Sequence, residues 1–530
     1  MNNPKKRSNS WESDSPPPPR TRARTHSLTL LGRSVGRHDE PRRRRRGGGG
    51  HRAVPLRRLL RVATIACGIQ FGWALQLSLL TPYVQELGVS HAWASLVWLC
   101  GPLSGLLVQP LVGHMSDRST SRFGRRAPFI FAGAASVAVA VLVIGFSSDI
   151  GRAIGDRTAS PRRPRAVVVF VIGFWLLDFA NNLTQGPCRA LIADLARSDQ
   201  RRARVAYAYY SFFMGVGNVL GYATGSYSRW FTIFPFTLTS SCSVSCANLK
   251  SAFLLDIVCL VFTAFLSLSA SQEVPLTSSF RASQFGDEMN PSEQTFFCEL
   301  FGSFKYLSRS IWIILIVTAL MWIGWMPFIL FDTDWMGRDI YKGIPNEGQN
   351  YYIGVRMGAL GLMLNSVVLG LASVLMDRLC KKWGSSLVWG LSNILTSLCF
   401  VTMVIISTVV KHMKFSENDL PPNGIVISSL VTFTLLGFPL AVAYSVPYSM
   451  ISYRTEQLGL GQGLSMGIMN LAIVLPQVVV SMGSGPLDAL FGGGNSPAFA
   501  VGAIAIFASG LLAILALPRS PPVVSPRMHA

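Results

Sequence analysis

The chain has 530 residues, of which 50% are apolar and only 14% are charged, and this balance excludes an ordinary soluble protein of that length. The formal net charge is +21, but residues 1–58 hold 16 Lys or Arg and only 4 Asp or Glu. This basic tail therefore carries +12 of the charge and the rest of the chain carries +9, and we expect no nucleic-acid partner. We also expect no enzyme activity, metal or cofactor, because no zinc, hydrolase or usable dinucleotide motif is present.

The tail, residues 1–55, combines a proline run, an arginine run at Arg42 to Arg46 and four glycines. Such a segment buries too little apolar surface to fold and is predicted to be disordered. It lacks the apolar stretch of a cleavable signal peptide. A basic segment next to a membrane span is typical of the cytoplasmic face, where anionic lipid is its natural contact.

Apolar runs of membrane-spanning length recur along the rest of the chain. They predict an all-α membrane protein with twelve transmembrane helices in two six-helix bundles. The spans are expected near 57–80, 93–115, 127–147, 166–190, 205–227, 251–270, 310–330, 351–376, 385–409, 424–448, 461–482 and 497–517.

This pattern divides the chain into an N-terminal bundle at 56–270, a polar cytoplasmic linker at 271–308, a C-terminal bundle at 309–518 and a short tail at 519–530. Lys and Arg after the second, fourth and eighth spans predict that both termini are cytoplasmic. The loop at 148–165 disagrees, because its five arginines should face the other side.

Two loops repeat each other at a fixed offset of 260 residues. DRSTSRFGRR begins at Asp117, between the second and third spans, and DRLCKKWG begins at Asp377, between the eighth and ninth. The repeat implies two related bundles with a binding site between them. Acids and bases at these helix ends predict a cytoplasmic gate, with anchoring by positive charge as the alternative; its members are Asp117, Arg118, Arg125, Arg126, Asp377 and Arg378.

The fourth span carries a polar stripe in an otherwise apolar helix. At 100° per residue Asp178 shares one side with a guanidinium about 16 Å below it and with three amides, namely Arg189, Asn181, Asn182 and Gln185. An ionisable residue within a membrane span indicates function by default. The stripe predicts a carrier of a polar solute, with a proton as its companion, since one carboxylate supplies too few oxygens for a metal-cation site.

Further amides and aromatics line other spans at helical spacing. Neutral, hydroxyl-rich ligands need such paired donors and acceptors beside flat apolar faces, so we expect a sugar site, and hydrogen bonding between helices is the alternative. The candidates are Gln70, Trp73 and Gln76 in the first span, Tyr444 and Tyr448 in the tenth, and Asn470 in the eleventh. Asp256 is expected near the interface, hydrated or capping its helix.

The pair Cys242 and Cys246 lies in the loop after the fifth span, on the non-cytoplasmic side. A disulfide forms there if the compartment is oxidising, and two free thiols are the alternative.

Five segments closely resemble plant sucrose–proton symporters of the major facilitator superfamily. They are Gly68 to Gly88, Trp98 to Arg118, Leu176 to Leu195, Phe331 to Tyr341 and Gly459 to Gln477. The resemblance extends from about Val54 to Pro518, and the runs VPLRRLL, SHAW and PLVGHMSDR are most similar to the branch assigned to the vacuolar membrane.

The resemblance implies roles for particular residues. Asp178 would be the proton acceptor and a sucrose contact, and Arg189 would assist coupling. His91 would lie near the sucrose entry path, and Asp334 and Arg338 would be needed for transport. The sequence departs from the family at two positions: Asp339 stands where a Glu is usual, and Ala127 where a third Arg is usual.

We therefore expect a secondary active transporter that couples the movement of sucrose, and of related glucosides, to H⁺, from vacuole to cytosol. The alternatives are a sugar sensor, whose basic tail signals, and an uncoupled glycoside facilitator. The expected location is the vacuolar membrane, with the plasma membrane as the alternative.

Overall fold

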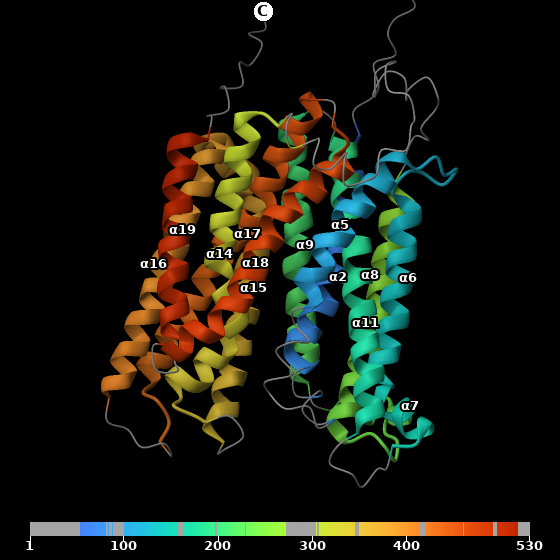
Figure 1. The fold of residues 1–530 in the computed structure, drawn as a ribbon, viewed down its shortest axis with the longest axis vertical. Helices are drawn as coiled ribbons and strands as arrows, with labels where there is room; N and C mark the ends of the chain where they lie inside the picture. Colours follow the sequence, from blue (N-terminus) through green and yellow to red (C-terminus); the bar gives the residue numbers. More distant parts are fainter. Residues whose placement is uncertain are drawn as a thin grey trace, which may run out of the picture. The chain divides into compact units, whose positions relative to one another are not determined.

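The computed structural model of the chain (Figure 1) describes residues 54–80, 83, 87, 100–156, 163–196, 199–227, 229–271, 304, 307–344, 349–413, 419–458, 460–490 and 495–517, without the side chains of 245 and 484–490. The predicted N-terminal tail and nearly all of the predicted linker lie outside this part. So do the C-terminal tail and His91.

The N-terminal half is built from long helices joined by short turns. Its elements are α1 (Leu56–Ala63), α2 (Ile65–Leu75), the π-helical turn η1 (Gln76–Leu80), α5 (Cys100–Arg118), α6 (Ala127–Gly145), α7 (Ser147–Ile154), α8 (Pro164–Ala196), α9 (Gln200–Ser226), α10 (Trp230–Ile233), the 3₁₀ turn η2 (Pro235–Thr237) and α11 (Val244–Ala270).

The C-terminal half follows the same plan. Its elements are α14 (Arg309–Trp335), the π-helical turn η3 (Met336–Ile340), α15 (Asn350–Trp383), α16 (Ser385–His412), α17 (Asn423–Gln457), α18 (Gln462–Leu490) and α19 (Ser496–Ala516). In the described part of both halves, ten helices are long and apolar enough to cross a membrane. The helices α5 and α9 also fall on predicted spans but are more polar.

The observed helices confirm the predicted fold class, although several are longer than their apolar cores. Helix α8 has 33 residues and α17 has 35, because the backbone stays helical beyond the apolar stretch.

The position of Asp256 was predicted wrongly. Asp256 is only 2% exposed and lies twelve residues after the start of α11, so it is not hydrated at the interface. The prediction failed because α11 begins seven residues before the apolar run.

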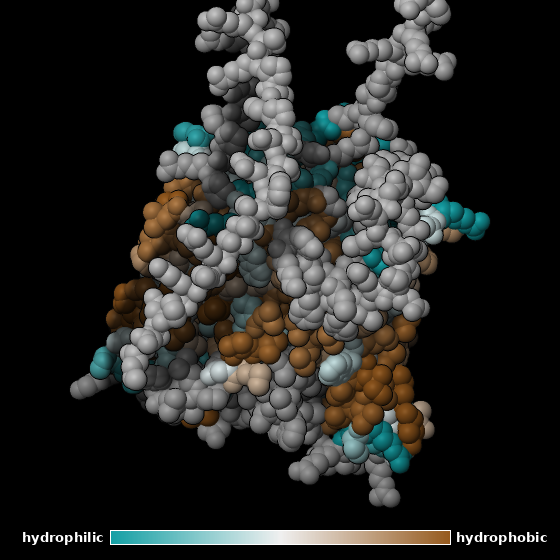
Figure 2. Space-filling view, turned by 45° about the horizontal axis from the view of Figure 1, so that its top comes forward, coloured by the Kyte–Doolittle hydropathy of each residue, from teal (hydrophilic) through white to brown (hydrophobic). Residues whose placement is uncertain are grey.

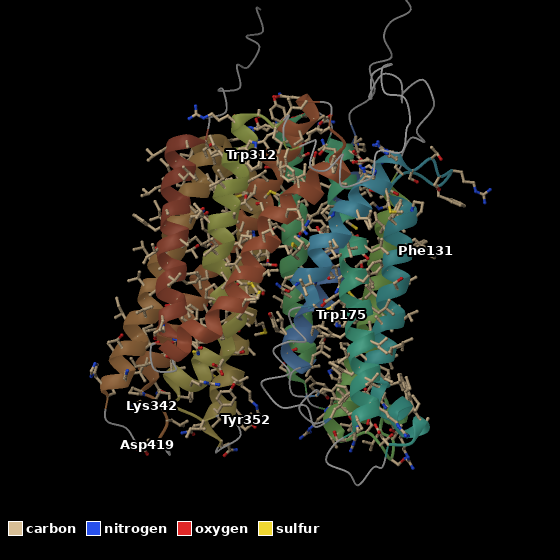
Figure 3. All side chains as sticks on the ribbon, in the orientation of Figure 1. Phe131, Trp175, Trp312, Lys342, Tyr352 and Asp419 are labelled. Carbon is tan, nitrogen blue, oxygen red and sulfur yellow. A yellow bond between two sulfur atoms is a disulfide. The ribbon has the colours of Figure 1, made fainter. Side chains whose placement is uncertain are left out.

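The outer face of the helices is apolar, as a lipid-facing surface requires. Brown, hydrophobic side chains cover much of the molecule in the space-filling view (Figure 2). Phe131 on α6 and Trp175 on α8, both labelled in Figure 3, are 66% and 50% exposed. This exposure of large apolar side chains is expected in a bilayer and would promote aggregation in water.

The two halves meet along particular helix pairs: α5 packs on α18, and α9 packs on α15 and α17. Glycines allow these backbones to approach closely. A side chain at Gly215 of α9 would meet the backbone of Gly370 at 2.9 Å, and one at Gly467 of α18 would meet Pro110 at 2.6 Å. We call the end at which Asp117 and Asp377 lie the gate end.

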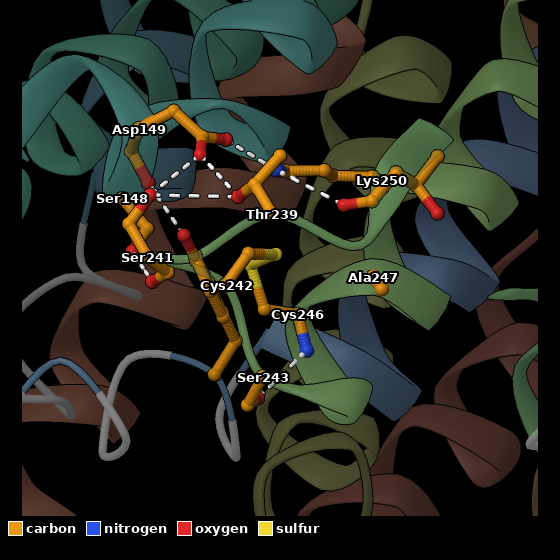
Figure 4. The surroundings of a disulfide bond; sticks show 12 residues. Ser148, Asp149, Thr239, Ser241, Cys242, Ser243, Cys246, Ala247 and Lys250 are labelled. Atoms are coloured by element: carbon orange, nitrogen blue, oxygen red, sulfur yellow. Dashed lines mark hydrogen bonds and ion pairs between the residues drawn. A yellow bond between two sulfur atoms is a disulfide. The ribbon is translucent and has the colours of Figure 1, made fainter. Parts of the chain in front are cut away.

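At the opposite end, α7 and the start of α11 are tied together by the cluster in Figure 4. Cys242 and Cys246 form a disulfide, which answers the question that the sequence left open. Lys250 donates to Asp149, and Thr239 and Ser241 donate to the same carboxylate. Burial alone would raise the pKa of Asp149, but these donors outweigh it and hold the pKa below its ordinary value.

The same cluster accounts for part of the arginine excess in the loop at 148–165. Arg163 donates to Ser148 Oγ at 3.0 Å and to the carbonyl oxygen of Ser241 at 2.9 Å. Arg165 donates to the carbonyl oxygen of Ile154. These two side chains therefore bind backbone and hydroxyl oxygens of the turn, a structural role that overrides the positive-inside pattern.

Candidate functional site

Asp178 lies about midway along α8 and is 2% exposed. Its Oδ2 atom is buried and has no hydrogen-bond partner in the part of the chain that the structure describes. Gly101 of α5 faces the carboxyl group, since a Cβ atom there would lie 3.5 Å from Oδ2. An unpaired, desolvated carboxylate costs several kcal/mol, roughly, so this position favours a proton or a hydrogen-bonding ligand.

The amides of the α8 stripe behave differently from one another. Asn182 accepts from Gln109 at 2.7 Å and donates to Ser104 Oγ at 2.8 Å, so it joins α8 to α5. Asn181 is 3% exposed, and its Nδ2 has no partner, whereas Gln185 is only partly buried. Asn181 therefore holds a buried hydrogen-bond donor, one turn from Asp178, that no described residue uses.

Asn470 of α18 connects the two halves near this stripe. Its Nδ2 donates to the carbonyl oxygen of Gly105 on α5 at 2.8 Å. A side chain at Gly105 would meet Asn182 Oδ1 at 3.3 Å. The C-terminal half thus contacts the N-terminal half beside Asn182, one helical turn from Asp178, at a position where a side chain would be tightly packed.

Arg189 is 8% exposed and is surrounded by tyrosines. Its guanidinium carbon lies 4.5 Å from the ring centre of Tyr448 and 5.9 Å from that of Tyr210. Tyr207 stacks on Tyr448 at 5.8 Å between centroids, and its hydroxyl donates to the carbonyl oxygen of Arg189. No ion pair joins Arg189 to a described carboxylate, so cation–π contact with the opposite half stabilises its charge.

Tyr207 and Tyr210 were not identified from the sequence as site residues. The available signal was the spacing of the YAYY run, which puts both rings on one face of α9. Tyr444, the predicted partner of Tyr448, is partly buried and lies 6.2 Å from the ring of Trp322.

The predicted stripe on the first span, which we call the α2 stripe, comprises Gln70, Trp73 and Gln76. Gln70 and Trp73 are partly exposed, whereas Gln76 is 2% exposed and its Oε1 has no partner. Gln76 is also the first residue of the π-helical turn η1. Such turns are frequent at functional sites.

A separate charged group lies at the end of α14 opposite the gate end. Arg338 pairs with Asp334 at 3.1 Å, and Tyr351 donates to the same carboxylate at 2.8 Å. The amide of Asn495 bridges Asp334 and Asp339, at 3.0 and 3.1 Å. The structure thus brings the three predicted charges together, and the sequence did not indicate that Tyr351 and Asn495 join them.

At the gate end, Asp117 binds across the two halves. It accepts hydrogen bonds from the backbone N–H groups of Gly463 and Leu464, in the first turn of α18, at 3.0 and 2.8 Å. This is the contact expected of a carboxylate at a helix N-terminus. Arg126 holds Asp117 from the other side and also bonds Asp194.

The arginines of this loop differ in their contacts. Burial alone would lower the pKa of Arg126, but Asp117 and Asp194 raise it above its ordinary value. Arg125 pairs with Asp194 at 3.2 Å, and Arg118 ends α5. The sequence did not suggest a role for Asp194, because it has no counterpart in the second loop.

The repeated loop occupies the equivalent place in the other half. Asp377 pairs with Lys381 at 2.5 Å and lies 3.9 Å from both Arg201 and Arg204, which belong to the N-terminal half. Arg378 does not join this group but lines a cavity of about 430 Å³ beside it. Arg201 and Arg204 were interpreted only as loop charge, yet they reach across the halves.

Among the described residues, no three His, Cys, Asp or Glu side chains lie together as a metal site would need. The polar groups around Asp178 and Arg189 are instead amides, hydroxyls and aromatic rings. Such a set can hydrogen-bond a hydroxyl-rich ligand and stack on its C–H faces.

Comparisons with known proteins agree with this description. The MFS/sugar transport protein family matches residues 62–273. Sucrose transport protein SUT2 of Oryza sativa subsp. indica is 63% identical over 476 residues, which cover 88% of this chain and 94% of the relative. Sucrose transport protein SUC4 of Arabidopsis thaliana is also 63% identical, over 88% of this chain and 91% of the relative.

A more distant relative and one solved structure of the same fold extend the picture. Sucrose transport protein SUC3 of Arabidopsis thaliana is 43% identical over 527 residues, which cover 87% of each chain. A bacterial homologue of the iron transporter ferroportin, solved in its outward-facing state, shares the fold, with a TM-score of 0.56 at 14% identity. It covers 87% of this chain and 98% of its own.

The relatives are transporters by name, and the helices of this chain cross a membrane many times. The extent and level of the identity leave no doubt about the relationship. The chain belongs to the sucrose transport protein family and is a multi-pass membrane transporter, not an enzyme.

Proposed function

We propose that the protein couples the movement of sucrose, and of related glucosides, to the movement of H⁺ through Asp178. The observation that carries the proposal is the buried Oδ2 of Asp178, which has no hydrogen-bond partner among the described residues. A bound proton removes the cost of this charge, and sugar hydroxyls supply the missing hydrogen bonds. The names of the relatives support sucrose as the sugar.

In this mechanism, Asp178 takes up a proton from the more acidic compartment, and the neutral acid then binds sugar together with Asn181. The amide of Asn181 has a free Nδ2 group one turn from the carboxyl, where it can donate to a hydroxyl oxygen. Binding is strongest when proton and sugar are both present, because each removes part of the cost of leaving the buried Asp178 and Asn181 side chains without partners. That mutual dependence is what couples the two fluxes.

Arg189 has a different role in the proposal. Its cation–π contact with Tyr448 fastens the two halves on the gate side of Asp178, together with the Asp117 contact to α18. Release of both contacts would let the halves rock and expose the site at the gate end. The charge of Arg189 would then face the site and favour loss of the proton.

The direction and the membrane follow from the sequence resemblance. The branch that the chain most resembles is assigned to the vacuolar membrane, so we propose transport from the acidic vacuole to the cytosol, with both termini in the cytosol. Each pH unit across the membrane contributes about 1.4 kcal/mol per proton to sugar accumulation.

The experiment that tests the proposal is [¹⁴C]sucrose uptake into proteoliposomes under an imposed pH gradient, acidic outside. We expect accumulation above the equilibrium level, and we expect a protonophore to abolish it. Equal uptake with and without the gradient would contradict coupling and leave an uncoupled facilitator. Sucrose binding without uptake would instead favour a sugar sensor.

A further inference from the structure

A second buried carboxyl group lies in the N-terminal half, outside the site described above. Asp256 is 2% exposed at about the middle of α11, and its Oδ1 atom is buried without a hydrogen-bond partner. It faces α2, where a Cβ atom at Gly72 would lie 3.0 Å from Oδ2 and 3.2 Å from Oδ1. A side chain at this position would press on the carboxyl group, so glycine suits the close approach.

Gln76 is the next residue on the same side of α2. It follows Gly72 by one turn, and helical side chains lean back toward the N-terminus over the preceding turn. Its amide group therefore leans toward Gly72, the residue that the Asp256 carboxyl group faces. Its Oε1 is also buried and has no hydrogen-bond partner among the described residues. Two unsatisfied groups, one from α2 and one from α11, are thus directed toward Gly72.

Among the described residues, no ion pair reaches Asp256. Helices α2, α6 and α10, which pack on α11, contain no charged residue, and the nearby titratable groups are the thiols of Cys259 and Cys67. Helix α1 carries three arginines but bonds α11 near its far end, where Ser267 donates to the carbonyl oxygen of Val62, and Lys250 is paired with Asp149. Burying a carboxylate among such neighbours is costly, which favours the neutral acid. A neutral carboxyl group carries an O–H donor, and that donor is what Gln76 Oε1 lacks.

We propose that Asp256 is a positioning residue for sugar binding, whose protonated carboxyl group donates a hydrogen bond to Gln76. This bond fixes the amide of Gln76 in the α2 stripe, with its Nε2 left free to donate to a hydroxyl of the ligand. Loss of the proton would turn the amide around, because a carboxylate can only accept from Nε2. The inference rests on the proposed sugar transport and adds a second protonation, distinct from that of Asp178.

The test compares Asp256→Asn and Asp256→Leu with the wild type by sucrose counterflow, which needs no pH gradient, at a series of equal internal and external pH values. Asn keeps a donor for Gln76 but cannot titrate, whereas Leu provides neither. We expect Asp256→Leu to raise the KM for sucrose about tenfold with little change in maximal rate, as for one lost hydrogen bond. Asp256→Asn should retain the low KM and remove part of its pH dependence.

Two further variants make the outcome specific. Gln76→Leu alone should raise the KM, and the double variant with Asp256→Leu should be no worse than the poorer single variant, as expected for one shared interaction. Thr263→Val, two turns along α11 against Gly68, is the matched control and should leave the KM unchanged. If Asp256→Leu does not fold, the dependence of the sucrose KM on pH in Asp256→Asn and in Gln76→Leu still tests the inference.

The inference is overturned if Asp256→Leu binds sucrose like the wild type, if Asp256→Asn is as impaired as Leu, or if the two positions act additively. These results leave the proposed function untouched, because the wild type still transports. A wild type that exchanges no sucrose would instead contradict the proposed function itself, and this inference with it.

Discussion

At the residue scale, Arg189 shows how a buried cation is stabilised here without a carboxylate. Tyr448, which belongs to the other half of the molecule, has its ring centre 4.5 Å from the guanidinium carbon. Tyr207, which belongs to the same half as Arg189, stacks on Tyr448. A desolvated cation–π contact contributes roughly 2 kcal/mol. Because the two groups belong to different halves, the contact exists only while these halves stay together.

We predict that Tyr448→Leu lowers the maximal rate of sucrose uptake by about tenfold, since it removes the aromatic face that holds Arg189. Tyr448→Phe keeps that face and should transport at close to the wild-type rate. Initial rates in proteoliposomes at saturating sucrose measure both. A Phe variant as slow as the Leu variant would show that the hydroxyl group matters and the ring does not.

The sequence could predict part of this residue-level picture. Helical periodicity along one span was enough to place Asp178, Asn181 and Arg189 on one side of α8. It could not reveal that Tyr207 and Tyr448 enclose Arg189, because such contacts depend on how α9 and α17 pack. The depth of Asp256 was missed for a related reason: hydropathy marks the apolar part of a helix but not its true beginning.

At the scale of elements, polar contacts of the α7–α11 cluster hold these helices together at the end opposite the gate end. Lys250 from α11 reaches Asp149 on α7, and Arg163 at the start of α8 ties Ser148 to Ser241. The disulfide between Cys242 and Cys246 lies in the same connection. The loop sequence suggested the disulfide as one of two outcomes, but nothing in it identified Asp149 as the carboxylate that accepts from Lys250, Thr239 and Ser241.

We predict that Asp149→Asn destabilises the protein at neutral pH by about 1.5–3 kcal/mol, the usual contribution of a hydrogen bond to a charged group. Because the folded pKa of Asp149 lies below its ordinary value, the stabilisation is complete above the ordinary value of 3.8 and is lost as the pH falls through the lower folded value. Thermal unfolding of both proteins in detergent, at pH 7 and at pH 3, measures the difference.

The difference in unfolding temperature between wild type and Asp149→Asn should therefore be larger at pH 7 than at pH 3. A difference that stays constant over this range would mean that the carboxylate charge contributes nothing. Asp156→Asn serves as a control, since Asp156 lies in the same turn and binds only the backbone N–H groups at 165 and 166.

At the scale of the whole molecule, the two repeated loops fasten the halves at one end in similar ways. Asp117 of the first half binds the first turn of α18 in the second, and Asp377 of the second half faces Arg204 near the start of α9 in the first. The fixed offset of 260 residues predicted that both acids lie at the same end. It could not predict their partners, because these belong to helices packed across the two halves.

We predict that Asp117→Ala speeds amide hydrogen exchange at Gly463 and Leu464 by about tenfold or more, because both N–H groups lose a charged acceptor. Exchange followed by mass spectrometry on peptides from the start of α18 measures this effect. Asp377→Ala is the matched control, and it should alter the start of α9 instead. Unchanged exchange in α18 after Asp117→Ala would contradict a fastening role for Asp117.

The central claim, that Asp178 carries the proton that accompanies the sugar, is tested most directly by comparing two assays of Asp178→Asn. The amide cannot titrate but can still hydrogen-bond a hydroxyl group. Sucrose counterflow at equal pH should therefore persist in this variant, while accumulation driven by a pH gradient should disappear. Gradient-driven accumulation that survives in Asp178→Asn would contradict the claim, because the proton would then be bound elsewhere.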